Sequence, residues 1–113
     1  MEYVEWAAGF FDGEGCISFK GGAGGKYAGR YVHLIVEQKD RRPLDRLQTL
    51  FGGNIYAGTN KWRWSIQQKD LVRKALTLML PHLTVKRERA LVGLERLTLV
   101  YPRESRQEKM SKT

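Results

Sequence analysis

The sequence has little cysteine, little histidine and no long apolar run, and each shortage excludes a class of protein. The single cysteine, Cys16, cannot form an internal disulfide, and the two histidines complete no Cys/His pattern that would hold zinc. The longest nearly apolar run, residues 75–83, is too short to span a bilayer. The start of the chain, with Glu2 and Glu5, lacks the basic segment of a secretory signal. We therefore expect an intracellular protein, in the cytoplasm, nucleoid or an organelle, that is neither secreted nor membrane-bound.

Acidic residues are also outnumbered by basic ones. The 113 residues include 20 Lys and Arg against 12 Asp and Glu, which gives a net charge of +8. This balance favours a polyanionic partner, although small ribosomal proteins, membrane-surface binders and nucleases all share it. The length and a hydrophobic content of 42% predict one domain, residues 1–101, followed by a polar tail, residues 102–113.

Hydrophobic spacing predicts four helices and two β-hairpins in the order helix, two strands, helix, two strands, helix, helix. Apolar residues three and four positions apart favour helices over residues 2–12, 43–51 with Asp40 as a cap, 71–79, and from about residue 86. Alternating apolar residues favour strands at residues 17–20, 31–36, 54–58 and 61–68. The glycine-rich residues 21–26 between the first two strands are typical of a hairpin tip.

The fold class expected from this order is α+β. Each hairpin has one apolar face, and that of the second hairpin includes Trp62, Trp64 and Ile66. A four-stranded antiparallel sheet should therefore be covered by helices on its apolar side only. We interpret both tryptophans as core residues. The opposite, wet face would carry Ser18, Lys20, Arg30, Tyr31, His33, Tyr56, Arg63, Ser65 and Gln67. A twisted β-ribbon with such side chains fits the major groove of DNA.

Segment 6–15, WAAGFFDGEG, has the most specific pattern in the chain. Asp12 and Glu14 lie at the end of the predicted first helix, where the helix dipole disfavours carboxylates unless a cation or donor compensates them. A compensated acidic pair indicates a divalent metal. The small residues 7–9 indicate that another helix approaches closely, and the glycines on either side of Glu14 would end the helix and turn the chain.

Residues 7–15, AAGFFDGEG, resemble the nine-residue signature of the LAGLIDADG homing endonucleases. Phe occupies two of the apolar positions, Ala7 replaces the first Leu, and Glu14 stands where Asp is also frequent. Residues 36–47 look like the family's strand-to-helix junction, where Gln38 takes the place of a glutamine near the metal site. Residues 81–89 look like the turn that delivers a lysine, here Lys86, to the active site.

The resemblance implies a homodimeric, metal-dependent endonuclease that cuts both strands of a specific DNA site and supports intron or intein mobility. The implied catalytic residues are Glu14, Gln38 and Lys86, and Glu14 and Gly13 would bind Mg²⁺, for which Mn²⁺ would substitute. Asp12 would be mainly structural, bonding backbone amides at the partner helix. The implied dimer interface comprises Ala7, Ala8, Gly9, Phe11 and Asp12.

The expected partner is double-stranded DNA with a long, pseudo-palindromic target. Besides the wet sheet face, Lys26, Lys39 and Arg41 are predicted to contact the phosphate backbone. A dimer would have a net charge of +16 (2 × +8), so its affinity for DNA should fall steeply with salt. His33 has no obvious catalytic partner in the sequence, so we interpret it as a DNA contact or an exposed residue rather than a general base.

Two other classes of function remain open at this point. One is a catalytically inactive nucleic-acid-binding protein of the same fold, such as an RNA splicing maturase or a transcriptional regulator. The other is a small basic structural protein of a ribonucleoprotein, in which the motif would be a coincidence. Together, Glu14, Gln38 and Lys86 argue against a decayed site.

Overall fold

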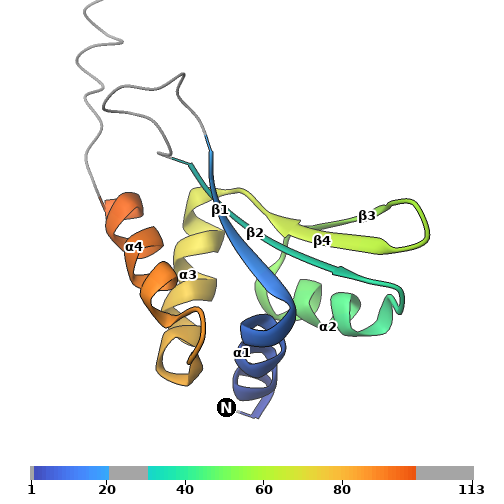
Figure 1. Cartoon of the computed structure of the whole chain (residues 1–113), viewed down its shortest axis with the longest axis horizontal. Helices are drawn as coiled ribbons and strands as arrows, with labels where there is room; N and C mark the ends of the chain where they lie inside the picture. The colour runs from blue at the N-terminus through green and yellow to red at the C-terminus, as the bar shows by residue number, and fades with distance from the viewer. Residues whose placement is uncertain (1, 21–30, 99–113) are drawn as a thin grey trace, which may run out of the picture.

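The computed structural model describes residues 2–20 and 31–98 (Figure 1). In chain order, its elements are α1 (Glu2–Glu14), β1 (Gly15–Lys20), β2 (Tyr31–Gln38), α2 (Arg42–Phe51), β3 (Asn54–Ala57), β4 (Trp62–Ile66), α3 (Lys69–Met79), the 3-10 helix η2 (Leu80–His82) and α4 (Arg87–Thr98). This is the predicted α+β order. Lys26, Arg30, the end of the predicted domain at residue 101 and the predicted tail 102–113 lie outside the described residues.

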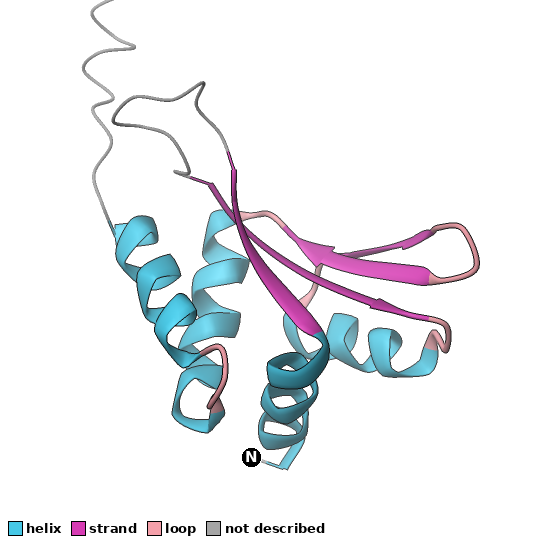
Figure 2. Cartoon of the chain, in the orientation of Figure 1, coloured by secondary structure: helices cyan, strands magenta, loops and turns pink. Residues whose placement is uncertain are grey.

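The four strands form one antiparallel sheet in the order β1-β2-β4-β3. The two hairpins therefore meet along β2 and β4, where Val36 lies opposite Trp64. The helices of residues 2–98 all lie on one side of the sheet, as Figure 2 shows, and none of them covers its other face, which we call the uncovered face. Both features match the prediction that only the apolar face is covered.

The core fills the space between the sheet and the helices. Trp64, Phe11 and Leu34 are fully buried, with no exposed surface. The indole Nε1 of Trp64 donates a 2.9 Å hydrogen bond to the carbonyl of Gly52, so its polar atom is satisfied where the chain leaves α2. Trp62 is half-buried and packs against the core. The structure thus supports the interpretation of both tryptophans as core residues.

Helix α1 is longer than predicted, because it continues through Gly13 to Glu14 and passes directly into β1. A helix tolerates an interior glycine at a cost of about 1 kcal/mol relative to Ala. Packing requires glycine at Gly15 instead, because a Cβ there would overlap the Phe11 ring. Glu14 is therefore the last helical residue rather than part of a loop.

The start of α2 also differs slightly from the prediction. Arg41, not Asp40, occupies the N-cap position, but an Asp40 carboxylate oxygen still accepts a 2.9 Å hydrogen bond from the backbone N–H of Arg42. The Arg42 guanidinium binds the same carboxylate and, with the backbone bond, lowers the pKa of Asp40 to about 2. Asp40 thus satisfies a free amide of the first turn from one position further out.

Candidate active site and nucleic-acid interface

The uncovered sheet face presents polar side chains in rows that run across the strands. Ser18 lies opposite His33, and Lys20 lies opposite Tyr31. The predicted wet-face residues within the described ranges all have the expected parity, as their registers show: Ser18, Lys20, Tyr31, His33, Tyr56, Arg63, Ser65 and, one residue beyond β4, Gln67. The alternation in the sequence therefore identified this face correctly.

The middle of this face is hollowed. The hollow has a volume of about 450 Å³ and is lined by Lys20, His33, Ile35, Glu37, Tyr56, Ala57, Gly58, Thr59, Lys61, Arg63, Ser65 and Gln67. Ser65 is only 5% exposed, so it forms the floor of the hollow and has little surface of its own. Tyr56, which is 49% exposed, stands at the rim. Cations, hydrogen-bonding groups and an aromatic ring thus surround one concave surface.

His33 contributes to this surface in its neutral form. Its burial, together with the charge of nearby Lys20, lowers the pKa of the imidazole below its ordinary value of 6.5. At neutral pH the ring therefore both donates and accepts hydrogen bonds and adds no positive charge. These properties suit contact with a base edge better than attraction of phosphate.

Glu37 also lies on this face, although it is not among the residues predicted from the sequence. Its carboxylate is 3.0 Å from Lys61 Nζ and 2.9 Å from Arg63 Nη2. These hydrogen bonds lower the pKa of Glu37, so it stays ionised at neutral pH. The alternation along β2 could have revealed Glu37, because it has the same parity as Tyr31 and His33.

A second hollow, of about 490 Å³, lies beside the first and contains two of the predicted catalytic residues. Its lining is Glu14, Cys16, Ile35, Glu37, Gln38, Lys39 and Lys61. Ile35, Glu37 and Lys61 line both hollows, so the two are continuous along the sheet. Helix α1 thus delivers the exposed carboxylate of Glu14 to the place where β2 ends at Gln38.

The predicted catalytic lysine also lies at the α1 terminus, but outside this hollow. The Lys86 ammonium donates a 2.6 Å hydrogen bond to the main-chain carbonyl of Asp12, and Lys86 is not among the residues that line the hollow with Glu14. A cation at this point compensates the negative end of the α1 dipole. The structure therefore brings Glu14 and Gln38 into one hollow and holds Lys86 beside the last turn of the same helix.

Asp12 has a structural role, but its partners differ from those predicted. Its carboxylate accepts hydrogen bonds from the backbone N–H groups of Thr84, Val85 and Lys86, at 3.2, 3.0 and 2.9 Å. These amides belong to its own chain, just before α4, and not to a partner helix. Desolvation acts against ionisation, but the bonds from Lys86, Val85 and Thr84 outweigh it and lower the pKa of Asp12.

The predicted dimer interface also needs correction. Ala7, Ala8 and Phe11 have no exposed surface, because they face the sheet and helices of their own chain. Gly9 and Gly13 lie on the exposed side of α1, and a Cβ at either position would have no neighbour within 4 Å. The small residues of α1 thus lie on two sides of the helix. Ala7 and Ala8 face the core, whereas Gly9 and Gly13 face outward, where another molecule could approach.

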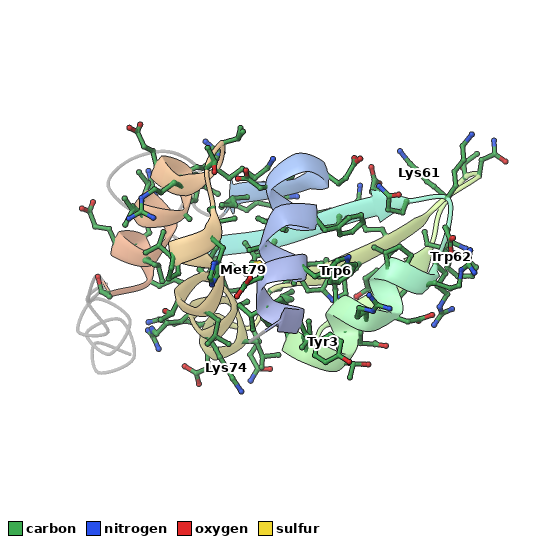
Figure 3. The ribbon with its side chains drawn as sticks, turned by 90° about the horizontal axis from the view of Figure 1, so that it is seen from below. Tyr3, Trp6, Lys61, Trp62, Lys74 and Met79 are labelled. Carbon is green, nitrogen blue, oxygen red and sulfur yellow. The ribbon has the colours of Figure 1, made fainter. Side chains whose placement is uncertain are left out.

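Aromatic residues flank the open side of α1. Trp6 and Phe10 stack with their ring centroids 5.3 Å apart, and the Arg46 guanidinium lies 4.8 Å from the centre of the Trp6 ring. Figure 3 shows Tyr3 and Trp6 on the side of α1 that faces α2. Trp6 therefore contacts α2 through Arg46, and Phe10 stacks against Trp6 along α1.

The predicted phosphate contacts at the end of β2 are exposed. Lys39 lines the hollow with Glu14. Arg41 is engaged within the chain, since its Nε is 3.0 Å from the Asp45 carboxylate and its guanidinium lies 4.8 Å from the centre of the Trp62 ring. Lys39 is therefore better placed than Arg41 to meet an external anion.

Residues 2–20 and 31–98 contain no group of three or more His, Cys, Asp or Glu side chains arranged to hold a metal ion. The oxygen donors at the end of α1 are the Glu14 carboxylate and main-chain carbonyls, which a helix leaves without internal partners in its last turn. Mg²⁺ prefers oxygen ligands and retains several waters, so this donor set fits part of a magnesium shell. The remaining ligands would have to come from water, substrate or a second chain.

The structure is similar to those of several homing endonucleases. The homing endonuclease I-CvuI, solved with a DNA target in the presence of Mg, has a TM-score of 0.72 and 24% identity, and the match covers 83% of this chain and 64% of that one. The archaeal intron-encoded homing endonuclease I-Vdi141I, complexed with DNA, has a TM-score of 0.65 and 20% identity, and the match covers 81% of this chain and 64% of that one. The homing endonuclease I-TnaI has a TM-score of 0.60 and 18% identity, and the match covers 96% of this chain and 95% of that one. The chain thus spans less than two thirds of the length of the first two.

Sequence comparison supplies the family. No curated protein sequence matches the chain, and no helix in the described part of the chain is long and apolar enough to cross a membrane. The family model described as LAGLIDADG endonuclease matches residues 7–86, a range that begins in the motif of α1 and ends at Lys86. The chain belongs to the LAGLIDADG endonuclease family.

Proposed function

We propose that this protein is a divalent-metal-dependent, site-specific DNA endonuclease that acts as a homodimer. The observation that carries the proposal is that Glu14 and Gln38 line one hollow, which continues into the concave, cation-bearing face of the sheet. A polyanion lying on that face would pass directly over the Glu14 carboxylate. The net charge of +8 favours the same ligand.

The proposed metal ligands in each chain are the Glu14 carboxylate and the main-chain carbonyl of Gly13. We expect Mg²⁺ as the physiological ion and Mn²⁺ as a substitute, since both accept oxygen ligands. When bound, such a metal activates water and stabilises the leaving 3′-oxygen of a phosphodiester.

The other two catalytic residues would act on the water and on the phosphate. The Gln38 amide can both donate and accept hydrogen bonds, so it can orient a nucleophilic water in the hollow that it shares with Glu14. Lys86 would stabilise negative charge that develops on the phosphate in the transition state. Its ammonium has three donors, of which the carbonyl of Asp12 takes one.

The proposed dimer forms through the exposed side of α1. Without side chains at Gly9 and Gly13, a second copy of this helix could approach closely and bring its own Glu14 to the same point. The dimer would then have one Glu14 carboxylate from each chain at its centre, and each of the two active sites would cut one DNA strand. The target would then be long and nearly palindromic, because a two-fold axis presents the same sheet face to both half-sites.

The cellular role follows from the family. Because the chain belongs to the LAGLIDADG endonuclease family, we expect it to act on DNA inside the cell and to promote the mobility of an intron or intein. Each sheet would lie in the major groove, and the catalytic centre would face the minor groove between the two half-sites, where both strands are cut.

The test is selection of cleaved sites from a randomised duplex DNA library with Mg²⁺. The wild-type protein should yield one nearly palindromic site, and Glu14→Gln should bind that site but cut it at least about 100-fold more slowly. Asp70→Asn, on the exposed surface of α3, removes the same charge and should cut at the wild-type rate. Tight, specific binding by the wild type without any nicking would instead favour the inactive nucleic-acid-binding protein of the same fold.

A further inference from the structure

An acidic side chain lies on the sheet face that we propose contacts DNA, where a negative charge opposes the binding of phosphate. Glu37 accepts hydrogen bonds there from both Lys61 and Arg63. Its side chain is 33% exposed and those of Lys61 and Arg63 are about half exposed, so solvent screens both ion pairs. Exposed ion pairs add little to folding stability, which makes stability a weak reason for an acid at this position.

The way in which Glu37 holds Arg63 is more informative. Arg63 Nε donates to Glu37 Oε2 at 3.0 Å, and Arg63 Nη2 is 2.9 Å from the same oxygen. These two nitrogens form one edge of the planar guanidinium. Nη1 and the outer hydrogen of Nη2 form a second edge, and the described part of the chain gives that edge no hydrogen-bond partner.

The register fixes where this second edge lies. Glu37 on β2 is directly opposite Arg63 on β4, and Arg63 is directly opposite Tyr56 on β3. The three side chains therefore form one row across the uncovered face, and all three line the 450 Å³ hollow. Arg63 is anchored on the β2 side of this row and keeps its other donors for a ligand in the hollow.

We propose that Glu37 is a positioning residue that holds Arg63 by one edge so that the other edge reads a guanine in the major groove. This inference rests on the proposed function. Arginine bonded to guanine O6 and N7 through two parallel donors is the commonest specific contact between proteins and DNA bases. An arginine that is already held in place loses less conformational freedom on binding than a free one.

Glu37 also has a second effect, on specificity. It offsets one of the two positive charges beside it and so weakens attraction to phosphates of any sequence. Specificity is the difference between the affinity for the right site and the affinity for wrong sites. A group that weakens binding to wrong sites therefore increases specificity. Glu37→Gln should therefore bind random DNA more tightly while discriminating less.

The experiment is binding selection from a randomised duplex DNA library with Ca²⁺, carried out for the wild type, Glu37→Gln, Arg63→Ala and Asp70→Asn. The wild type should prefer guanine about tenfold or more at one position in each half-site. Arg63→Ala and Glu37→Gln should both reduce that preference, at the same position, to about threefold or less. Asp70→Asn removes an equal charge on α3 and should keep the wild-type preference.

The outcomes separate this inference from the proposed function. If the wild type selects a site and Glu37→Gln selects the same site just as strictly, Glu37 does not position Arg63 and the inference fails alone. It also fails if Glu37→Gln changes a position that Arg63→Ala leaves unchanged. If the wild type enriches no sequence, both the inference and the proposed function are overturned.

Discussion

Asp12 and Lys86 hold each other at two points, although they lie 74 positions apart in the chain. The Asp12 carboxylate accepts the backbone N–H of Lys86 at 2.9 Å, and the Lys86 ammonium donates to the main-chain carbonyl of Asp12 at 2.6 Å. The first bond satisfies an amide at the start of α4, and the second satisfies a carbonyl at the end of α1. One residue pair thus caps two helices and fixes a catalytic candidate beside the α1 terminus.

The first prediction concerns the stability that this pair provides. Asp12→Asn should lower the free energy of unfolding by about 1–2 kcal/mol, because the start of α4 loses a charged acceptor in the role of an N-cap. Urea unfolding at a fixed protein concentration measures the change. Asp70→Asn is the control, since Asp70 is exposed and its one ion pair within the described residues is with Arg73 nearby in α3, and it should change stability by less than about 0.5 kcal/mol. Equal stability of Asp12→Asn and the wild type would contradict the structural role.

The second prediction is the pH dependence of that difference. The pKa of Asp12 in the folded protein is lowered from its ordinary value of 3.8, so the folded state favours the ionised form. The stabilisation should therefore be complete above the ordinary value and be lost as the pH falls below it, through the lowered folded value. Urea unfolding at about pH 7 and about pH 3 should show a wild-type advantage over Asp12→Asn that shrinks at the lower pH. A constant difference would mean that Asp12 acts without its charge.

The sheet and helices could be predicted because each leaves its own period in the sequence. Trp62, Trp64 and Ile66 alternate with polar residues, so their strand, its apolar face and its wet face follow from one pattern. The end of α1 could not be predicted in this way, because glycine at position 13 is compatible with either a turn or an exposed helical position. In the structure Gly13 takes the exposed helical position, and Gly15 leaves room for the Phe11 ring, a packing contact that hydrophobic periodicity does not record.

The site was predictable in its residue types more than in its contacts. The motif indicates Glu14 by its position in the signature. Periodicity, in contrast, does not say what packs against Ala7, Ala8 and Phe11, and in the structure these residues pack in the core of their own chain. The partners of Asp12 lie more than 70 positions away and are backbone amides, which have no sequence signature. Glu37 matters because it lies opposite Arg63, and such a pairing depends on the register of two hairpins.

The third prediction tests the proposed dimer interface on the exposed side of α1. Gly9→Leu should leave the single chain folded, since a Cβ at this position meets nothing within 4 Å and Leu favours helix more than Gly does. The added side chain should keep two copies of α1 apart and weaken the dimer at least about tenfold. Sedimentation equilibrium measures this, with Thr77→Leu on the exposed face of α3 as the control for added apolar bulk. A Gly9→Leu protein that dimerises as tightly as the wild type would show that α1 is not the interface.

The fourth prediction separates catalysis from binding at Lys86. Lys86→Met keeps the length of the side chain but removes the charge, so the single-turnover rate of DNA cleavage should fall about 100-fold. The dissociation constant for the same DNA, measured with Ca²⁺, should change much less. Lys86→Arg restores a cation and should recover part of the rate. A parallel loss of rate and affinity would instead identify Lys86 as a phosphate contact.

The last prediction concerns the direction from which DNA approaches. Lys39 is exposed and lines the hollow with Glu14, whereas Lys74 is exposed on α3, in the helical layer (Figure 3). Each phosphate contact changes the slope of log K against log salt by about one unit, whatever the DNA sequence. Lys39→Ala should therefore reduce the slope by about one, and Lys74→Ala should leave it unchanged, although both variants lose the same net charge. Equal slopes for the two variants would mean that the protein responds only to its total charge, and DNA would not lie along the sheet.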